Sequence, residues 1–318
     1  MRDLKDQVVQ GGHISKQDAL HISSISDQDI FYLFASANKI RTRFRGNKAN
    51  LCSIINAKSG LCSEDCSFCA QSCKSKASIE VYPLLGKEEV MRKALEAKNS
   101  GAKRFSIVTS GRKVVREDLS KIADMISSIK EIGLSPCASL GLLNGDALSM
   151  LRQAGLNRYH HNLETAERFF PHICSTHSYA DKVATIKAAR SAGLSLCSGG
   201  LFGLGETWED RIDMAFALRE LDVESVPINF LIPVKGTTTG GNDLLHPFEA
   251  LKIISLYRFI LPQKEIRICG GRMQVLGDFH ALVFAAGADG MITGNYLTTL
   301  GRSPADDVRL ITLCGLFA

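Results

Sequence analysis

The sequence predicts an α/β fold, a (β/α)8 barrel of the TIM type preceded by a helical extension. Short apolar runs alternate eight times with amphipathic segments, as expected for the strands and helices of one closed parallel sheet. Several amphipathic segments end in glycine, which commonly stops a helix just before the next strand. A length of 318 residues is normal for such a barrel.

The extension, residues 1–48, is expected to be helical over about residues 14–47. Ser15 and Ser26 are candidate N-caps, and Gly46 is the candidate helix end. Between them lies an apolar stripe with helical spacing, formed by Ile30, Leu33, Phe34, Ala37 and Ile40.

Residues 49–318 are expected to form one barrel domain with a C-terminal tail, and no low-complexity linker divides them. The expected strands are Leu51–Ala57, Arg104–Thr109, Leu134–Leu140, Arg158–Leu163, Leu194–Gly200, Ser225–Leu231, Glu265–Cys269 and Gly290–Gly294. The expected helices are Lys87–Ser100, Arg116–Ile132, Gly145–Ala154, Tyr179–Ala192, Trp208–Leu221 and Pro247–Leu261. The helix-ending glycines are Gly101, Gly133, Gly155 and Gly193.

The composition narrows the classes of function. A hydrophobic fraction of 45% is typical of a globular protein with a large core. The net charge of +5 comes from dispersed basic residues and predicts no nucleic-acid partner. No apolar run reaches the roughly 18 residues of a membrane span, and the polar segment Met1–Gly12 lacks a signal-peptide core. Ten cysteines without a secretory signal favour a reducing cytoplasm and metal ligation over disulfides.

Three cysteines follow the first expected strand with C-x3-C-x2-C spacing: Cys62, Cys66 and Cys69. They can hold three irons of a four-iron cluster and leave the fourth iron open to a small ligand. A structural zinc site would favour two C-x2-C pairs, and only Cys66 and Cys69 have that spacing. Cys73 could be a fourth ligand, but it would close the cluster, so we interpret it as a spare thiol. With Phe68 before the third cysteine, the motif resembles that of radical S-adenosylmethionine (AdoMet) enzymes. In those enzymes the open iron binds AdoMet, and one electron releases a 5′-deoxyadenosyl radical.

Four further cysteines lie in the first, third, fifth and seventh expected strands: Cys52, Cys137, Cys197 and Cys269. Inward side chains of such a barrel stack in layers supplied by alternate strands, so these thiols could line one layer. This pattern indicates a second iron–sulfur cluster below the first. The alternative is that each cysteine packs as a small hydrophobic residue. Three thiolates would leave an iron open for a ligand such as sulfide, whereas four would close the site. Arg267 lies two residues before Cys269 and shares its face; its buried charge needs a partner, either an anionic cluster or an ordinary salt bridge.

Five segments resemble the biotin synthase family over nearly the whole barrel. They are Lys58–Gly60, Tyr159–Thr165, Cys197–Glu206, Glu224–Asn229, and Arg267 with Gly271 and Arg272. The resemblance implies that the AdoMet radical removes hydrogen from two unactivated carbons of dethiobiotin. A second cluster then donates the sulfur that closes the thiolane ring of biotin.

The resemblance also implies a set of AdoMet contacts beside the three motif cysteines. The backbone at Phe68 matches an adenine contact, and Glu164 matches an acidic residue near the ribose hydroxyls. Lys182 replaces an arginine expected to reach the AdoMet carboxylate; lysine keeps the charge but loses the bidentate fork. Gly199 and Gly200 suit a close approach of the backbone to a ligand, with ordinary turn formation as the alternative.

The resemblance assigns Asn162 and Asn229 to the ureido ring of the substrate. An amide side chain offers both a donor and an acceptor, as a urea requires. His160 stands where the family has an asparagine.

The second cysteine set departs from the family's familiar pattern, in which three cysteines and one arginine hold a two-iron cluster. Three positions match: Cys137, Cys197 and Arg267. The remaining cysteine, on the second strand, is Ser106 here, while Cys52 and Cys269 replace serines. We therefore predict a four-iron auxiliary cluster on the odd strands, with Arg267 and Ser106 beside it and not among its ligands.

Two other functions remain open at the level of sequence. A hydrogenase-maturation or methylornithine-synthase relative would not need the two asparagines or a floor lined by thiols. A non-catalytic iron–sulfur scaffold would not need an open iron. The resemblance further implies a flavodoxin or ferredoxin as electron donor and a homodimer, whereas Cys73, Cys174 and Cys314 have no assigned role.

Overall fold

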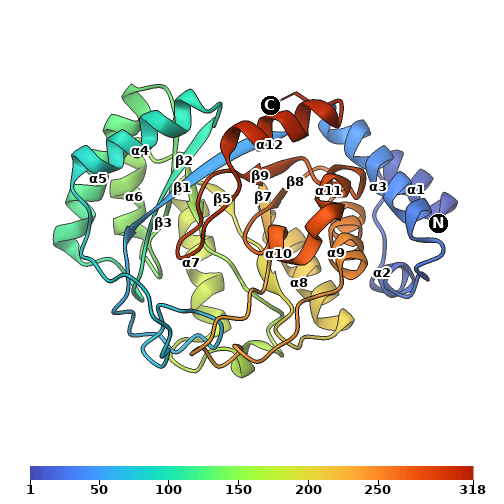
Figure 1. The fold of residues 1–318 in the computed structure, drawn as a ribbon, viewed down its shortest axis with the longest axis horizontal. Coiled ribbons are helices and arrows are strands. Elements are labelled where there is room, and N and C mark those ends of the chain that lie inside the picture. The colour runs from blue at the N-terminus through green and yellow to red at the C-terminus, as the bar shows by residue number, and fades with distance from the viewer. Residues whose placement is uncertain (318) are drawn as a thin grey trace.

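The computed structural model describes residues 1–317. Its strands form one parallel sheet that curls into a closed barrel (Figure 1). They are β1 (Asn50–Lys58), β2 (Arg104–Thr109), β3 (Ser135–Ser139), β4 (Arg158–His160), β5 (Ser195–Cys197), β6 (Gly200–Phe202), β7 (Ser225–Phe230), β8 (Glu265–Ile268) and β9 (Gly290–Ile292). β1 pairs with β9, and β5 pairs with β7, so the sheet closes on itself. Since β5 and β6 are two halves of one interrupted strand, the predicted eight-stranded barrel is confirmed.

The fifth strand is interrupted at Ser198 and Gly199, where we expected a continuous strand. An added Cβ at Gly199 would lie 2.0 Å from the carbonyl oxygen of Pro227 on β7. Only glycine allows the two strands to approach so closely here. On either side of the interruption, β5 pairs with β4 and β7, whereas β6 pairs with β7 and forms a single bridge from Gly200 to Glu164.

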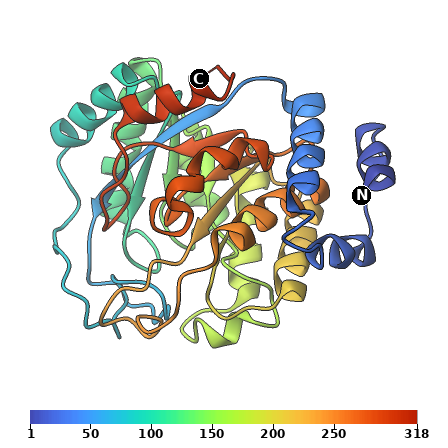
Figure 2. The same cartoon turned by 45° about the vertical axis from the view of Figure 1, so that its right-hand side comes forward.

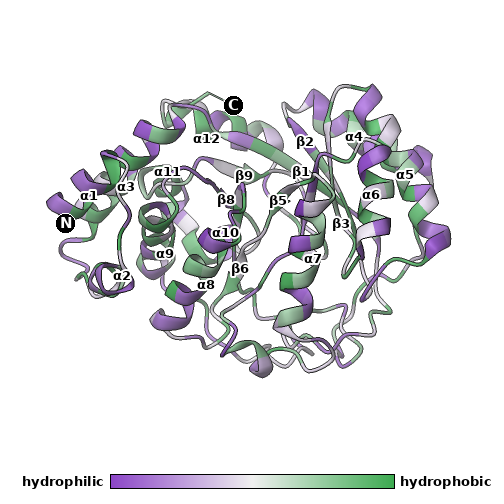
Figure 3. Ribbon diagram, turned by 180° about the vertical axis from the view of Figure 1, so that it is seen from behind, coloured by the Kyte–Doolittle hydropathy of each residue, from purple (hydrophilic) through white to green (hydrophobic). Residues whose placement is uncertain are grey.

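The six helices expected around the barrel all form within one residue of their predicted ends. They are α4 (Lys87–Asn99), α5 (Arg116–Glu131), α6 (Gly145–Gln153), α7 (Tyr179–Ser191), α8 (Trp208–Glu220) and α9 (Pro247–Ile260). Hydrophilic and hydrophobic residues alternate along them (Figure 3). In α5 the buried residues follow helical spacing, with Leu119, Ile122, Ile126 and Ile129 facing the core. The helix-ending glycines, such as Gly133, all have a positive φ, which explains the residue type.

Further helices precede and follow these six. At the C-terminal side lie α10 (Arg272–Leu276), α11 (Leu282–Ala285) and α12 (Pro304–Leu313), and two short 3₁₀ helices cover Phe170–His172 and Gly277–Ala281. No helix in the described part of the chain combines the length and hydrophobicity that crossing a bilayer requires.

The N-terminal segment contains α1 (Arg2–Val9), α2 (Lys16–Ser23) and α3 (Ile30–Arg45). α3 packs against α9 on one side of the barrel, and α1 packs against α3 (Figure 2). Ser15 caps α2 through a reciprocal pair of hydrogen bonds with Asp18, as predicted. The prediction for Ser26 was wrong: α3 begins after Asp29, and the Ser26 hydroxyl donates to the Asp29 carboxylate.

The register of the strands shows which side chains point into the barrel. Cys137 pairs with Arg158 on β4, and Cys197 pairs with His160 on the same strand. Cys52 pairs with Ile292 on β9. Alternate residues of a strand share a face. These side chains, and those two residues away on the same strand, therefore project into the barrel. A cavity lies beside them at the carboxyl ends of the strands.

Candidate functional site

A cavity of about 320 Å³ occupies the carboxyl end of the barrel, where the active sites of such barrels lie. Its walls include Cys62, Cys66 and Cys69 from the loop after β1. They also include Cys197 and Cys269, which lie at the ends of β5 and β8. One cavity therefore brings members of both predicted cysteine sets together.

The loop after β1 is held by its own polar residues. The Gln71 side chain accepts a hydrogen bond of 2.9 Å from the Gly60 backbone, and the Cys69 amide donates to the Cys66 carbonyl over 3.1 Å. Phe68 packs with Phe170 and the residues around it. Burial raises the pKa of the Cys69 thiol to about 11, so a metal that binds this thiol must displace its proton.

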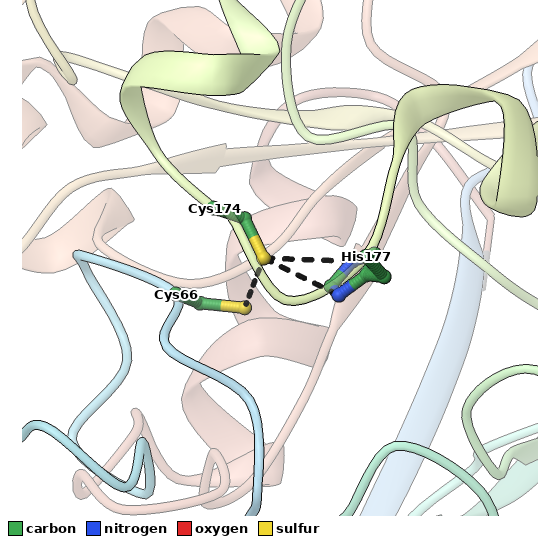
Figure 4. A group of neighbouring side chains, drawn as sticks. All are labelled: Cys66, Cys174 and His177. Carbon is green, nitrogen blue, oxygen red and sulfur yellow. Dashed lines mark hydrogen bonds between the residues drawn. The ribbon is translucent and has the colours of Figure 1, made fainter.

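Cys66 has a neighbour that the sequence did not reveal. Its Sγ lies 3.9 Å from the Sγ of Cys174, which in turn lies 3.3 Å from Nδ1 and 3.9 Å from Nε2 of His177 (Figure 4). The hydrogen bond from the Cys66 thiol lowers the pKa of Cys174 to about 4, with His177 adding to the effect, and raises the pKa of Cys66. The C-x2-H spacing of Cys174 and His177 was the available signal, but nothing in the sequence placed it beside Cys66.

The four strand cysteines are buried, and at most 2% of the surface of each residue is exposed. Cys52 and Cys269 lie on either side of Ile292, because Cys52 pairs with Ile292 and the residue before Cys269 pairs with Met291. Burial, with a contribution from the nearby thiols of Cys137 and Cys197, raises the pKa of Cys52 to about 12 against the opposing charge of Arg267. The structure thus places the four thiols in one region of the barrel floor.

Ser106 and His160 border this region from the even strands. Ser106 pairs with Cys137 in the sheet, and its Oγ lies 3.3 Å from Nδ1 of His160. Nε2 of His160 is buried without a hydrogen-bond partner among the described residues. Burial raises the pKa of Cys137, but His160 outweighs it and leaves that pKa below its ordinary value.

Arg267 points into the barrel as predicted, with 1% of its surface exposed. Its charge partner is Glu265, two residues earlier on the same face of β8. Glu265 also pairs with Arg158, whose Nη1 lies 3.3 Å from its carboxylate. The floor therefore carries two buried arginines for one buried carboxylate, and Nε of Arg267 has no partner among the described residues. Such a surplus of positive charge suits a bound anion.

Three polar side chains, those of Asn162, Glu164 and Lys182, line the same cavity. The side-chain amide of Asn162 donates to the Glu164 carboxylate over 3.4 Å, and Lys182 donates to the backbone carbonyl of Asn162 over 3.1 Å. Glu164 has a φ of 72°, a left-handed conformation that costs energy for a residue with a side chain and is common at functional sites. Burial raises the pKa of Glu164, although Lys182 opposes this shift.

Asn229 lines the same cavity from β7. Its carbonyl oxygen accepts from the Gly270 amide over 3.0 Å, and its nitrogen donates to the Gly200 carbonyl over 3.2 Å. These bonds orient the amide and leave one N–H and one lone pair for a ligand.

Packing within the protein explains why glycine is required at positions 199 and 200. An added Cβ at Gly200 would lie 2.4 Å from the Met214 side chain and 2.6 Å from the Glu164 carbonyl. The close approach of backbone at these glycines is thus to neighbouring protein atoms.

Comparison with known proteins decides between the remaining functions. Residues 58–218 match the Radical SAM superfamily, and residues 227–316 match the Biotin and Thiamin Synthesis associated domain. The chain is 54% identical to a biotin synthase of Thermodesulfovibrio yellowstonii over 93% of both chains, and 47% identical to one of Pelotomaculum thermopropionicum over 97% of both. The chain belongs to the biotin synthase family. It is therefore a radical AdoMet enzyme, and its family implies a four-iron cluster, AdoMet and an auxiliary cluster.

Solved structures of two other proteins share the fold. A methylornithine synthase superposes with a TM-score of 0.87 at 24% identity, covering 99% of this chain and 96% of that one. The [FeFe]-hydrogenase maturase HydG superposes with a TM-score of 0.84 at 17% identity, covering 99% and 74%. At these identities the likeness extends to the barrel and not to the reaction.

Proposed function

We propose that this chain inserts sulfur into dethiobiotin and takes the sulfur from an auxiliary cluster on the barrel floor. The observation that carries the proposal is the single cavity that joins the motif cysteines to Cys197 and Cys269. A substrate in that cavity would have an AdoMet-derived radical on one side and a sulfide source on the other.

Cys62, Cys66 and Cys69 would hold the AdoMet cluster. Lys182, buried beside Glu164, supplies a positive charge for the AdoMet carboxylate, and the Glu164 carboxylate supplies an acceptor for ribose hydroxyls. Phe68, Gly199 and Gly200 would complete the AdoMet site by shaping the loop and the strand beside it.

Cys52, Cys137, Cys197 and Cys269 would hold the auxiliary cluster, which we propose to be a four-iron cluster. Four buried thiols on alternate strands provide the donor set. The surplus positive charge and the unpaired Nε of Arg267 fit an anionic group at this position. Arg267, already oriented by Glu265, and Ser106, bonded to His160, would then border the cluster without ligating it.

Asn162 and Asn229 would bind the ureido ring of dethiobiotin. The side-chain oxygen of each asparagine accepts from a backbone N–H, that of Gly199 for Asn162 and that of Gly270 for Asn229. Each amide keeps capacity for one more donor and one more acceptor bond. When bound, the AdoMet cluster and the auxiliary cluster supply the carbon-activating radical and the sulfur. The chain itself orients the substrate, excludes water from the buried floor and neutralises the charges that its ligands bring.

We further propose a flavodoxin or ferredoxin as the source of electrons, a homodimer as the assembly and the cytoplasm as the location. The division into a helical extension, residues 1–48, and a barrel domain, residues 49–318, is also a proposal. These four statements rest on the family resemblance and on composition.

The decisive experiment is isotopic. Clusters are rebuilt anaerobically with ³⁴S-sulfide, free sulfide is removed, and the protein is incubated with AdoMet, dethiobiotin and a low-potential reductant. We expect 5′-deoxyadenosine and biotin that carries ³⁴S, both measured by mass spectrometry. Cys69→Ala should abolish both products, whereas Cys269→Ala should keep deoxyadenosine and lose biotin. Unlabelled biotin from the labelled wild type would contradict the proposed sulfur source.

A further inference from the structure

The side chains of Cys66, Cys174 and His177 form a compact donor set that shares only Cys66 with the two proposed clusters (Figure 4). Their ligand atoms all lie within 4.8 Å of one another. They come from two segments more than 100 positions apart, since Cys66 and Cys174 are separated by 108. Two thiols and an imidazole are donor types that bind metal ions in proteins.

We propose that the chain, before it receives the AdoMet cluster, binds one divalent ion of the Zn²⁺ or Fe²⁺ class through Cys66, Cys174 and His177. The site is mononuclear, and its fourth position is left to a solvent molecule. It is a loading or blocking site for the motif loop and takes no part in the radical reaction.

The distances suit tetrahedral coordination. With metal–sulfur bonds of about 2.3 Å and metal–nitrogen bonds of about 2.0–2.1 Å, two ligand sulfurs lie about 3.8 Å apart and a sulfur and a nitrogen about 3.6 Å apart. The two sulfurs here are 3.9 Å apart, and Nε2 of His177 is 3.9 Å from the sulfur of Cys174. Small side-chain movements would bring all three atoms to one ion.

The histidine is oriented as metal-binding histidines usually are. Its Nδ1 bonds to the Glu64 carboxylate, which also accepts from the Thr176 hydroxyl over 2.8 Å. A carboxylate on one ring nitrogen fixes the tautomer and leaves the lone pair on the other nitrogen for a metal. Both side chains are buried, with 6% of His177 and 7% of Glu64 exposed.

Asp65 fixes the position of Cys174 relative to Cys66. Its Oδ1 accepts from the backbone amides of Ser175 and Thr176 over 2.9 and 3.2 Å. Glu64 and Asp65 are the two acidic residues inside the C-x3-C spacing, so the motif loop itself clamps the segment that carries Cys174 and His177. The donor set is therefore held in place by the fold without an ion.

The ligand types determine which ions fit. Two thiolates and an imidazole favour Zn²⁺ and Fe²⁺ over Mg²⁺ and Ca²⁺, which prefer oxygen ligands. A metal ion could also reach the site through a second cavity, separate from the active-site cavity. Cys174 and His177 line a second cavity beside Phe170 and Tyr179, whereas Cys66 and His177 line the active-site cavity. An ion could reach the site from either side, and two thiol protons would leave as it binds.

Cys66 is shared with the proposed AdoMet cluster, and this part of the inference rests on the proposed function. A single ion at Cys66 and the AdoMet cluster exclude one another. Fe²⁺ at this position would be a first iron already attached to the motif loop, whereas Zn²⁺ would hold the loop against cluster assembly.

The test uses the full-length, cluster-free protein under anaerobic, reducing conditions and titrates it with Co²⁺, whose visible absorption reports tetrahedral thiolate coordination. The barrel-floor thiols can also bind Co²⁺, so the readout is the difference between variants. We expect Cys174→Ala and His177→Asn each to lose one equivalent of bound Co²⁺, or to bind it at least about 100-fold more weakly. Cys62→Ala and Cys73→Ala should bind as the wild type does, because both residues lie in the same loop but outside the site.

The controls separate this site from a site made by the motif cysteines alone. If Cys62→Ala loses the ion and Cys174→Ala retains it, the proposal is overturned. Circular dichroism verifies the fold of each variant. If Cys174→Ala does not fold, Co²⁺ binding by His177→Asn is the test of the proposal. None of these readouts depends on biotin formation, so the site can fail while the proposed function stands.

A second measurement follows assembly of the AdoMet cluster after preloading with one equivalent of Zn²⁺. We expect assembly to slow about tenfold in the wild type and to be unaffected in Cys174→Ala. Equal slowing in both proteins, or no slowing in the wild type, overturns the assignment.

Discussion

Removing the charge of Glu265 should destabilise the cluster-free chain much more than the cluster-loaded chain. In the Glu265→Gln variant the buried Arg267 loses its partner, and Arg158 loses a carboxylate at 3.3 Å. Burial opposes ionisation of Glu265, but the charges of Arg267 and Arg158 prevail and lower its pKa from 4.5 to about 2. At about 1.4 kcal/mol for each unit of pKa, the ionised carboxylate contributes about 3 kcal/mol to folding at neutral pH. That value agrees with the cost of breaking a buried ion pair, about 3–5 kcal/mol.

The pH dependence has a definite sign. Because the folded pKa of Glu265 is depressed, its contribution is complete above pH 4.5 and is lost as the pH falls from 4.5 toward 2. At pH 7 the loss of about 3 kcal/mol corresponds to a melting temperature lower by about 6 °C for a chain of this size. If an anionic cluster occupies the floor, Arg267 keeps a partner, and we expect the decrease to shrink to less than half.

The assay is anaerobic thermal denaturation of wild type and variant at one scan rate, with and without clusters. Asp289→Asn is a matched control, because Asp289 is also buried and its carboxylate lies 2.5 Å from the Arg258 guanidinium. Neither Asp289 nor Arg258 lines the cavity. The control should lose the same stability in both forms. If Glu265→Gln also loses the same stability in both forms, the reasoning that places an anion beside Arg267 is refuted.

Three further predictions concern other parts of the site. Cys269→Ala should lower the iron content of the reconstituted protein from about eight to about four per chain, as two four-iron clusters require. The control Cys314→Ala should keep all eight irons. A colorimetric iron assay and Mössbauer spectra measure the iron content and the cluster type. Asn229→Ala should raise the KM for dethiobiotin about tenfold through loss of one hydrogen bond, and an unchanged KM with normal AdoMet cleavage would remove this residue from the substrate site. Gly199→Ala should destabilise the fold by at least about 1–3 kcal/mol because its Cβ would meet a carbonyl oxygen 2.0 Å away, whereas Gly145→Ala, which has open space, should stay within about 0.5 kcal/mol in denaturant titrations.

The fold was predictable because each barrel unit carries a strong local signal. Apolar runs, amphipathic segments and glycines after helices repeat along the chain, and the structure reproduces all eight strand positions. The helices that were not expected lie outside this repeat. α1 is polar over most of its length, with Val8 as its buried residue, and α12 follows the last strand. Their positions depend on packing against distant segments, which a local pattern does not encode.

The site was predictable in part. The placement of cysteines on alternate strands follows from strand order, and the structure brings those thiols to one floor. The partner of Arg267 was within reach of the same argument, because Glu265 lies two residues away and shares its face. The contact between Cys66 and Cys174 was not, because it joins two loops whose relative position only the assembled barrel determines.

The cavity reaches from the three motif cysteines to Arg267, the partner of Glu265. In the proposed enzyme, AdoMet and substrate therefore occupy the same cavity that leads to the auxiliary cluster. Iron and sulfide for that cluster would have to enter before AdoMet and substrate bind, and a used cluster could be rebuilt only after both have left. The number of product molecules that one chain makes would then depend on ligand release and on rebuilding of the cluster, as well as on the chemical step.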